Sequence, residues 1–257
     1  VTELIDVAGS PLAVKIIGSI ANGPTVVMLH EGLGSMTQWR ELPDRIHSTT
    51  GLPVVSYDRS GYGRSPGGVK RYTVTFMHEE AQLTLPALLQ SLKIDQPVLI
   101  GHSDGGTIAL IAAACGSVTP VAVATIAAHI FVEQAGLDGV NAATSRRNQI
   151  VEGMSRHHND AAATFDRWSS IWRDPDFASF DMSDMLTNIS CPLLVLQGDR
   201  DEYATAEMVH GVTRRVPHAI GRFLADCGHI AHRDQPGLVV AELTRFVSDA
   251  LSPKSWD

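Results

Sequence analysis

Apolar and polar positions alternate in blocks along the chain, and these blocks predict a regular order of strands and helices. The largely apolar runs at residues 25–29, 121–128 and 192–196 are typical of strands buried on both faces of a parallel sheet. Between such runs, residues 73–92 carry apolar side chains at helical spacing, and Pro86 is expected to kink that helix. Strands that alternate with helices predict a mostly parallel sheet joined by right-handed crossovers.

The same patterns extend over the whole chain and predict an α/β fold with eight strands. The strands are expected at residues 2–7, 11–18, 25–29, 54–57, 98–100, 121–128, 192–196 and 222–224. Helices are expected at residues 39–47, 73–92, directly after residue 103, and at 207–216 and 239–251. We therefore predict an eight-stranded, mostly parallel sheet with helices on both faces.

The alternation of strands and helices stops at His129 and returns at Pro192. The intervening residues are more polar, helical in pattern, and rich in aromatic side chains in one portion. We expect a small helical cap at residues 129–187, inserted after the sixth strand. Residues 1–128 and 188–257 would then form the core domain.

Composition narrows the classes of partner. A chain of 257 residues suits one large domain, and its net charge of −8 argues against nucleic acid or an anionic membrane as partner. A small-molecule substrate is therefore the expected partner. The sequence does not predict an oligomeric state. No signal peptide or membrane span is visible, and the three cysteines are expected to be buried free thiols of a reducing compartment. These features predict a cytoplasmic protein, with a few residues expected before Val1 because the chain does not begin with Met.

A serine stands where an apolar strand meets an apolar helix. Residues 98–106 read VLIGHSDGG, so that Gly101 and Gly105 flank Ser103 in a G-x-S-x-G pattern. This strand–turn–helix context is that of a nucleophile elbow, where a sharp turn holds the serine hydroxyl above the end of the sheet. Glycines are expected on both sides because strand and helix approach too closely there for side chains.

A serine hydroxyl becomes a useful nucleophile when a base removes its proton and a third group orients that base. Two loops that follow the last two strands carry such groups. Residues 197–203 contain Asp199 and Asp201, and residues 226–232 contain His229. Because loops at the carboxyl ends of parallel strands gather at one edge, we expect an acid and a histidine to meet the serine there.

Together these motifs resemble the α/β-hydrolase fold superfamily over nearly all of the chain outside the cap. In that superfamily the acid commonly stands third after a glycine, which indicates Asp201 after Gly198, with Asp199 as the competing acid. The histidine follows a glycine near the start of the last helix, which indicates His229. The resemblance therefore implies that Ser103, Asp201 and His229 form a catalytic triad.

The same resemblance implies where an oxyanion would bind. The oxyanion loop of the superfamily commonly reads H-G-x after the third strand. Here it reads His30-Glu31-Gly32, so that Glu31 replaces the usual glycine. The backbone N–H groups of Asp104 and of Gly32, or else of Leu33, are expected to bind the oxyanion. Neither a cofactor nor a metal is expected.

Leu33, His129, Trp168 and Trp172 are the residues expected to form the substrate pocket. His129 ends a strand at the catalytic edge, where it either lines the pocket or packs inside the core. The two tryptophans stand at helical spacing and fit either the core of the cap or the pocket wall.

Other polar residues receive structural interpretations. His102 is expected to fill space with its ring turned away from the nucleophile, and Asp58 is expected to organise a glycine-rich loop. His157 and His158 have no partner at metal-ligand spacing and are expected on a solvated helix face. His232 is expected to be exposed near the start of the last helix.

A serine at the elbow excludes relatives that attack with a carboxylate, such as haloalkane dehalogenases and epoxide hydrolases. We predict a carboxylesterase-like serine hydrolase (EC 3.1.1) that cleaves small-to-medium, fairly apolar esters through an acyl-enzyme. Hydrolysis of a lactone or enol-lactone, a thioester, or the C–C bond of a meta-cleavage product uses similar machinery and is an alternative. A small-molecule receptor that retains the triad is the non-enzymatic alternative, and a cofactor-free oxygenase or perhydrolase-type activity is a weaker one.

Overall fold

A computed structural model describes residues 2–252 of the chain. Its strands form one sheet in the order β1-β2-β4-β3-β5-β6-β7-β8. They are β1 (Thr2–Val7), β2 (Ser10–Ile17), β3 (Pro24–Leu29), β4 (Val54–Tyr57), β5 (Gln96–His102), β6 (Ala122–Ile126), β7 (Leu193–Gly198) and β8 (Ile220–Leu224). β2 pairs antiparallel with β1 and with β4, whereas every pair from β4 to β8 is parallel. The prediction of a mostly parallel, eight-stranded sheet is confirmed.

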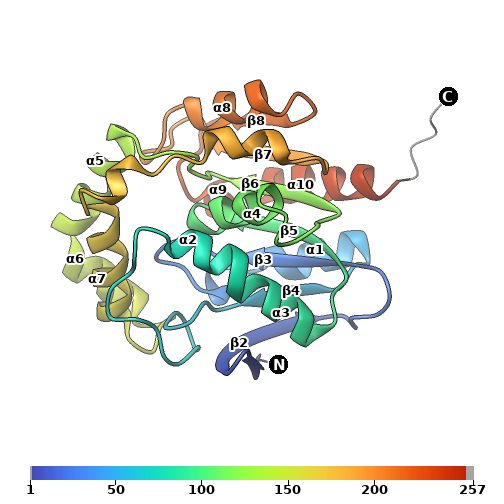
Figure 1. Cartoon of the computed structure of the whole chain (residues 1–257), viewed down its shortest axis with the longest axis horizontal. Helices are drawn as coiled ribbons and strands as arrows, with labels where there is room; N and C mark the ends of the chain where they lie inside the picture. The colour runs from blue at the N-terminus through green and yellow to red at the C-terminus, as the bar shows by residue number, and fades with distance from the viewer. Residues whose placement is uncertain (1, 253–257) are drawn as a thin grey trace.

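Helices cover both faces of this sheet (Figure 1). α1 and α10 pack against each other on one face, and α2, α3, α4 and α8 cover the other. The helices are α1 (Leu42–Thr50), α2 (Phe76–Glu79), α3 (Leu85–Leu92), α4 (Asp104–Ala114), α5 (Gln134–Ser145), α6 (Arg147–Met154), α7 (Ala161–Trp172), α8 (Glu207–Arg215), α9 (Ala231–Asp234) and α10 (Pro236–Leu251). The 3₁₀ turns are η1 (Met36–Trp39), η3 (Phe177–Ser179) and η4 (Ser183–Asn188), and η2 (Glu80–Thr84) is a π-turn.

The central strands are buried on both faces, as their apolar runs predict. In β3, Val26 and Met28 belong to the hydrophobic cluster beneath α1 and α10, whereas Val27 and Leu29 belong to the cluster beneath α4. Successive side chains of a strand point to opposite faces, so a run without polar interruption serves two cores at once.

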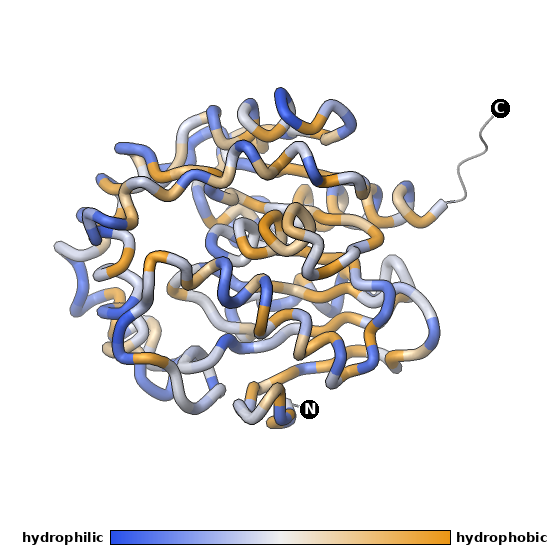
Figure 2. The backbone as a smooth tube through the Cα atoms, viewed as in Figure 1, coloured by the Kyte–Doolittle hydropathy of each residue, from blue (hydrophilic) through white to orange (hydrophobic). Residues whose placement is uncertain are grey.

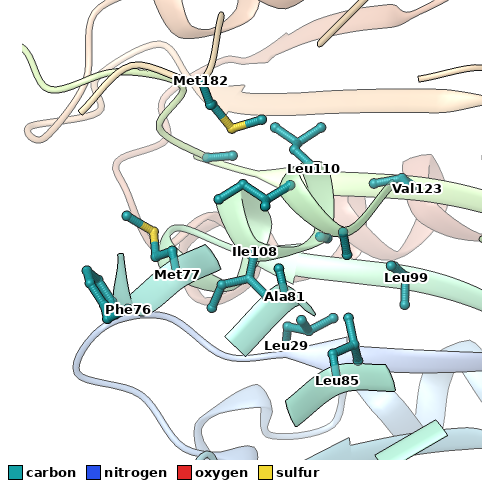
Figure 3. Packing of buried hydrophobic residues seen from close by; sticks show 14 of the residues in the cluster. Leu29, Phe76, Met77, Ala81, Leu85, Leu99, Ile108, Leu110, Val123 and Met182 are labelled. Atoms are coloured by element: carbon teal, nitrogen blue, oxygen red, sulfur yellow. The ribbon is translucent and has the colours of Figure 1, made fainter. Parts of the chain in front are cut away.

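Helix α4 lies against the middle of the sheet and is buried almost all round. Figure 2 shows hydrophobic residues concentrated in the central strands and in α4. In Figure 3, Ile108 and Leu110 of α4 lie among side chains of the strands and of the neighbouring helices. A helix that is apolar on every side belongs in the core, so packing fixes the position of its N-terminus, where Ser103 stands.

Two helical regions differ from the sequence-based expectation. The helix expected at residues 73–92 is divided into α2, η2 and α3, and Pro86 stands at the beginning of α3. Because Pro86 has no N–H to donate to the carbonyl of Gln82, the turn before it widens into π geometry. The helix expected at residues 39–47 begins at Leu42, after the 3₁₀ turn η1, and no sequence pattern predicted the short α9.

Between β6 and β7 the chain leaves the sheet and forms α5, α6, α7, η3 and η4. In this segment, called here the insertion (residues 127–192), α5, α6 and α7 lie at the left of Figure 1, whereas η4 packs against α4 and α8 of the core. An isolated bridge joins Phe131, before α5, to Asp181, after η3. Asp160 caps α7, because its carboxylate accepts the N–H of Ala163 at 2.9 Å.

Among residues 2–252, no helix combines the length and the apolar character needed to span a membrane. The cysteines are free thiols, as expected, and Cys227 is buried. Contrary to expectation, Cys191 is only half-buried, and Cys115 is exposed because it follows the last residue of α4 where that helix reaches the surface.

Candidate active site

Ser103 occupies the sharp turn between β5 and α4. Its φ of 50° and ψ of −119° form a backbone conformation that residues with side chains rarely adopt. An added Cβ at Gly101 would clash with the backbone of Gly105, and one at Gly105 would clash with the backbone of Leu29. The close approach of strand and helix therefore requires both glycines, as the G-x-S-x-G pattern predicts.

The three side chains expected to form a triad meet at the end of the sheet. Ser103 Oγ lies 3.0 Å from His229 Nε2, and His229 Nδ1 lies 2.9 Å from Asp201 Oδ1. Because an ionised carboxylate only accepts, His229 Nδ1 carries the proton and donates it to Asp201. Nε2 is then free to accept the hydroxyl proton of Ser103.

The competing acid, Asp199, points elsewhere. It is exposed, and its Oδ1 accepts the backbone N–H of Cys227 at 3.2 Å. Asp201 is held in place because its Oδ1 also accepts the N–H of Tyr203 at 2.9 Å. Of the two aspartates, Asp201 is the one that contacts His229.

Opposite charges tune the two ionisable partners. Burial lowers the pKa of His229, but the charge and hydrogen bond of Asp201, with Glu202 and Glu31 nearby, raise it above its ordinary value. Burial raises the pKa of Asp201, but His229 and the Tyr203 N–H lower it below its ordinary value. The pair therefore favours an imidazolium facing a carboxylate, the state in which a general base has accepted its proton.

The expected oxyanion donors lie beside the nucleophile. Asp104 is the first residue of α4, where backbone N–H groups have no partner within the helix. Gly32 and Leu33 line the same cavity, and within residues 2–252 their N–H groups donate to no other atom. An added Cβ at Gly32 would clash with the indole of Trp168 and lie 2.8 Å from Asp104 Oδ2, so only glycine fits there.

Glu31, which replaces the usual glycine, leaves this loop well ordered. Its carbonyl oxygen accepts hydrogen bonds from His30 Nδ1 and Arg59 Nη2, both at 2.8 Å, and from the Gly34 N–H at 3.1 Å. Its side chain folds back beneath the loop, where a Cβ on Gly34 would clash with the carboxyl group. Three donors therefore fix the backbone that carries Gly32.

A cavity of about 460 Å³ opens beside Ser103. That volume lies within the range of about 300–1,000 Å³ that is usual for small-molecule sites. The four residues expected in the pocket, Leu33, His129, Trp168 and Trp172, all line it. Further apolar wall comes from Val140, Ile150, Met154 and Ile230.

His129 and the two tryptophans both pack in the core and line the pocket, the two alternatives that the sequence left open. All three are buried, and all three also face the cavity. Burial, reinforced by the charge of His229, lowers the pKa of His129 to about 3, so its ring is neutral. The His129 ring lies 5.1 Å from that of Trp172 and 5.9 Å from that of His229.

Two histidines are located differently from the expectation. His158 is buried: its Nδ1 accepts the Gly63 N–H at 3.0 Å, and its Nε2 donates to the Leu33 carbonyl at 3.1 Å. His232 is also buried, with its ring 4.9 Å from that of Trp39. Both expectations were wrong because the partners of these rings come from loops far away in the sequence.

Some functional contacts have no clear sequence signal. Glu202 Oε2 accepts the backbone N–H of His229 at 3.1 Å, and the buried Arg59 Nη2 lies 3.9 Å from Asp104 Oδ2. Asp58 holds the neighbouring loop, as expected, by accepting the N–H groups of Met36 and Arg64, both at 2.7 Å. Residues 2–252 contain no group of His, Cys, Asp and Glu side chains arranged for a metal ion.

Several known proteins with similar sequences or folds are named as lipases or esterases. A model of the alpha/beta hydrolase family matches residues 26–243. The sn-1-specific diacylglycerol lipase ABHD11 of Mus musculus is 24% identical, over 96% of this chain and 88% of that protein. A bacterial membrane phospholipase A aligns with a TM-score of 0.80 and 17% identity, over 98% of this chain and 87% of that chain. A thermophilic esterase from Thermogutta terrifontis aligns with a TM-score of 0.77 and 19% identity, over 98% and 99%.

Proposed function

The chain belongs to the alpha/beta hydrolase family, and we propose that it is a serine hydrolase that cleaves carboxylic esters through an acyl-enzyme. The observation that carries this proposal is the hydrogen-bonded series from Ser103 through His229 to Asp201 at the wall of the cavity. We assign Ser103 as nucleophile, His229 as general base and then acid, and Asp201 as the group that orients the imidazole.

In the proposed first half-reaction, Ser103 Oγ attacks the ester carbonyl while its proton passes to His229 Nε2. The carbonyl oxygen becomes an oxyanion, which the N–H groups of Asp104 and of Gly32 or Leu33 would bind. The C–O bond to the alcohol then breaks, and His229 returns the proton to the departing alkoxide. The products of this step are a free alcohol and Ser103 carrying the acyl group.

In the second half-reaction, water replaces the alcohol. His229 removes a proton from water, the hydroxide oxygen attacks the acyl carbon, and the same N–H groups would bind the second oxyanion. Collapse of this intermediate breaks the bond to Ser103 Oγ, which recovers its proton from His229. The carboxylic acid leaves, and each residue returns to its starting protonation state.

The lining of the cavity supports small-to-medium, fairly apolar substrates, as expected of a carboxylesterase. Leu33, Val140, Ile150 and Met154 offer apolar contact, while the volume of about 460 Å³ limits the size of the acyl and alcohol groups together. The insertion supplies much of this wall through α5, α6 and α7. We therefore propose that residues 129–187 act as a cap that selects the substrate, while residues 1–128 and 188–257 carry the chemistry.

The test combines covalent labelling with a substrate panel. A fluorophosphonate should modify Ser103, as located by peptide mass spectrometry, and Ser103→Ala should abolish both labelling and ester turnover. The panel contains p-nitrophenyl esters of increasing acyl length, a lactone, an aryl thioester and a vinylogous diketone. The fastest turnover on the esters is the expected result.

The other outcomes exclude the proposal in different ways. Faster turnover on the lactone, thioester or diketone would reassign the reaction while keeping the triad. Tight ligand binding with no turnover above that of Ser103→Ala would indicate a receptor. A fluorophosphonate adduct on a residue other than Ser103 would remove the assigned nucleophile.

A further inference from the structure

The loop after β7 is packed against the first helix of the insertion. The carboxylate of Glu133, directly before α5, accepts the backbone N–H of Thr205 at 2.6 Å and the Thr205 hydroxyl at 2.8 Å. Three residues further along, a Cβ on Gly136 would lie 3.3 Å from the carbonyl oxygen of Tyr203. Because residues three apart lie on the same side of a helix, one face of α5 lies against this loop.

The ring of Tyr203 packs against the same helix. A Cβ on Gly139 would lie 2.6 Å from Cδ1, 2.9 Å from Cε1 and 3.0 Å from Cγ of this ring. Carbon atoms in favourable contact are about 3.5–4.0 Å apart, so only glycine allows α5 and the ring to approach this closely. This contact explains a glycine within α5, where glycine otherwise weakens a helix.

The same ring contacts the histidine assigned as general base. The Tyr203 ring centroid lies 4.7 Å from that of the His229 imidazole, and the two planes are inclined at 45°. The backbone N–H of Tyr203 also donates to Asp201 Oδ1 at 2.9 Å, the oxygen to which His229 Nδ1 donates. Tyr203 therefore contacts the acid through its backbone and the base through its ring.

The backbone of this loop is fixed to the sheet as well. Gln197, a buried residue of β7, donates from Nε2 to the carbonyl oxygens of Ala204 and Thr205, both at 3.1 Å. These two bonds hold the backbone beside Tyr203 on the core. A change in the packing of α5 is therefore expected to move the ring of Tyr203 rather than the loop.

We propose that Tyr203 is a positioning residue through which α5 of the insertion sets the orientation of the His229 imidazole. The ring contacts Gly139 and the imidazole at once, so the position of α5 determines how the imidazole lies relative to Ser103. Substrate selection by the insertion and catalysis by the core then share one side chain. The kinetic effect of Tyr203 rests on the hydrolase function proposed above, whereas its contact with His229 does not.

The first experiment measures that contact without any substrate. In protein labelled with ¹³C-histidine, the carbon-bound protons of the His229 imidazole lie in the ring current of Tyr203, and His229→Gln identifies their signals. These signals should stay near their wild-type positions in Tyr203→Phe and move in Tyr203→Ala, which has no ring. Gly139→Ala should move them too, because its methyl group displaces the ring.

The second experiment is a double-mutant cycle on kcat for p-nitrophenyl acetate. Tyr203→Ala and Gly139→Ala should each lower kcat about 10- to 30-fold with KM within about threefold, because a misplaced imidazole accepts the Ser103 proton less efficiently. The double variant should lose no more than Tyr203→Ala alone, since the added methyl group then meets no ring. Tyr203→Phe retains the ring and should keep kcat within about twofold of the wild type.

Gly237→Ala is the matched control for the added methyl group. Gly237 lies in α10, where an added Cβ meets nothing within 4 Å, so the His229 signals and kcat should both stay unchanged. Urea unfolding identifies the variants that are folded under the assay conditions. If Tyr203→Ala does not fold, the comparison of Gly139→Ala with Gly237→Ala and the wild type still decides the outcome.

The possible failures are distinguishable. Unmoved His229 signals in Gly139→Ala would overturn the positioning role, because α5 would then not control the ring. Losses in kcat that multiply in the double variant would also overturn it, since Gly139 and Tyr203 would act independently. If no ester is hydrolysed, the rate of fluorophosphonate labelling of Ser103 replaces kcat. Moved His229 signals without turnover or labelling would support the contact and overturn the hydrolase function.

Discussion

The hydrogen bond between Asp201 and His229 decides which imidazole nitrogen faces Ser103. Asp201→Asn removes the charge that stabilises the imidazolium, and an amide can also donate to Nδ1 and favour the wrong tautomer. The corresponding substitution in a Ser-His-Asp triad lowers kcat about 10⁴-fold, and we expect a loss of about 10³- to 10⁴-fold here. Initial rates on a p-nitrophenyl ester measure it.

Asp199→Asn is the matched control, because an amide oxygen can still accept the N–H of Cys227. Asp199 is exposed, and we expect kcat to change by less than about threefold. If Asp199→Asn were the more damaging substitution, the role of the acid would move from Asp201 to Asp199.

The protonation of His229 sets the acid limb of the pH–rate profile. Only the neutral ring can accept the Ser103 proton, and Asp201 raises the pKa of His229 above 6.5 despite burial. The value of kcat/KM should therefore rise with pH and level off only above an apparent pKa higher than 6.5. In Asp201→Asn the residual activity should show this limb shifted to lower pH, and an unshifted limb would assign it to another group.

At the scale of single residues, the sequence predicted those residues that belong to local motifs. Ser103, Asp201 and His229 follow strands at fixed offsets, so their chemistry can be read without knowing the packing. The contact of Glu31 with His102 and the burial of His158 and His232 depend on loops brought together from far apart. The pattern of residues along one chain does not show which distant loops pack together.

Trp168 and Trp172 lie on the same helix, α7, but face different neighbours. Trp168 covers Gly32 of the oxyanion loop, whereas the ring of Trp172 lies 5.1 Å from that of His129. Trp168→Ala should therefore lower kcat/KM for small and bulky esters alike, because the loop loses its cover. Trp172→Ala should alter mainly the bulky ester, because a large group contacts more of the cavity wall that this ring forms.

Each truncation should also destabilise the fold, since both side chains are buried. A buried tryptophan replaced by alanine typically costs about 3–5 kcal/mol, which urea unfolding can measure. Rates on p-nitrophenyl acetate and benzoate, taken well below the unfolding midpoint, separate stability from selectivity. Equal losses on both esters for Trp172→Ala would make that residue purely structural.

The elements themselves were largely predictable because their signals are local. Apolar runs identified the buried strands, although β6 ends at Ile126, two residues before the end expected for that strand. The boundaries that failed are those where one residue changes the local hydrogen bonding. Pro86 forces a π-turn before α3, and the 3₁₀ turn η1 delays the start of α1 until Leu42.

Considered as a whole, the molecule joins an apolar framework to a layer of buried polar side chains. The strand order was not predicted from the sequence; right-handed crossovers between parallel strands only reduce the number of possible orders. His30, His129 and His158 are buried where the insertion meets the loops of the core, and His232 is buried beside Trp39. Burial lowers the pKa of each of the four, so the folded protein holds them neutral.

That burial makes the stability of the whole molecule sensitive to acid. A histidine whose folded pKa is lowered binds its proton more readily when unfolded, so its stabilising effect is complete above pH 6.5 and declines as the pH falls. For His158, burial lowers the pKa to about 4, which by pH 5 corresponds to a loss of roughly 2 kcal/mol. With four such groups, the free energy of unfolding should fall steeply between pH 6.5 and 4.5.

His158→Gln tests this prediction on one group. A glutamine can accept the Gly63 N–H and donate to the Leu33 carbonyl, yet it cannot take up a proton. Between pH 6 and 4.5, the slope of unfolding free energy against pH should decrease by about 1.4 kcal/mol per pH unit, the effect of one proton. Urea unfolding at successive pH values, carried out on the wild type and on His158→Gln, measures this slope. Equal slopes in His158→Gln and the wild type would mean that His158 does not take up a proton on unfolding in this range.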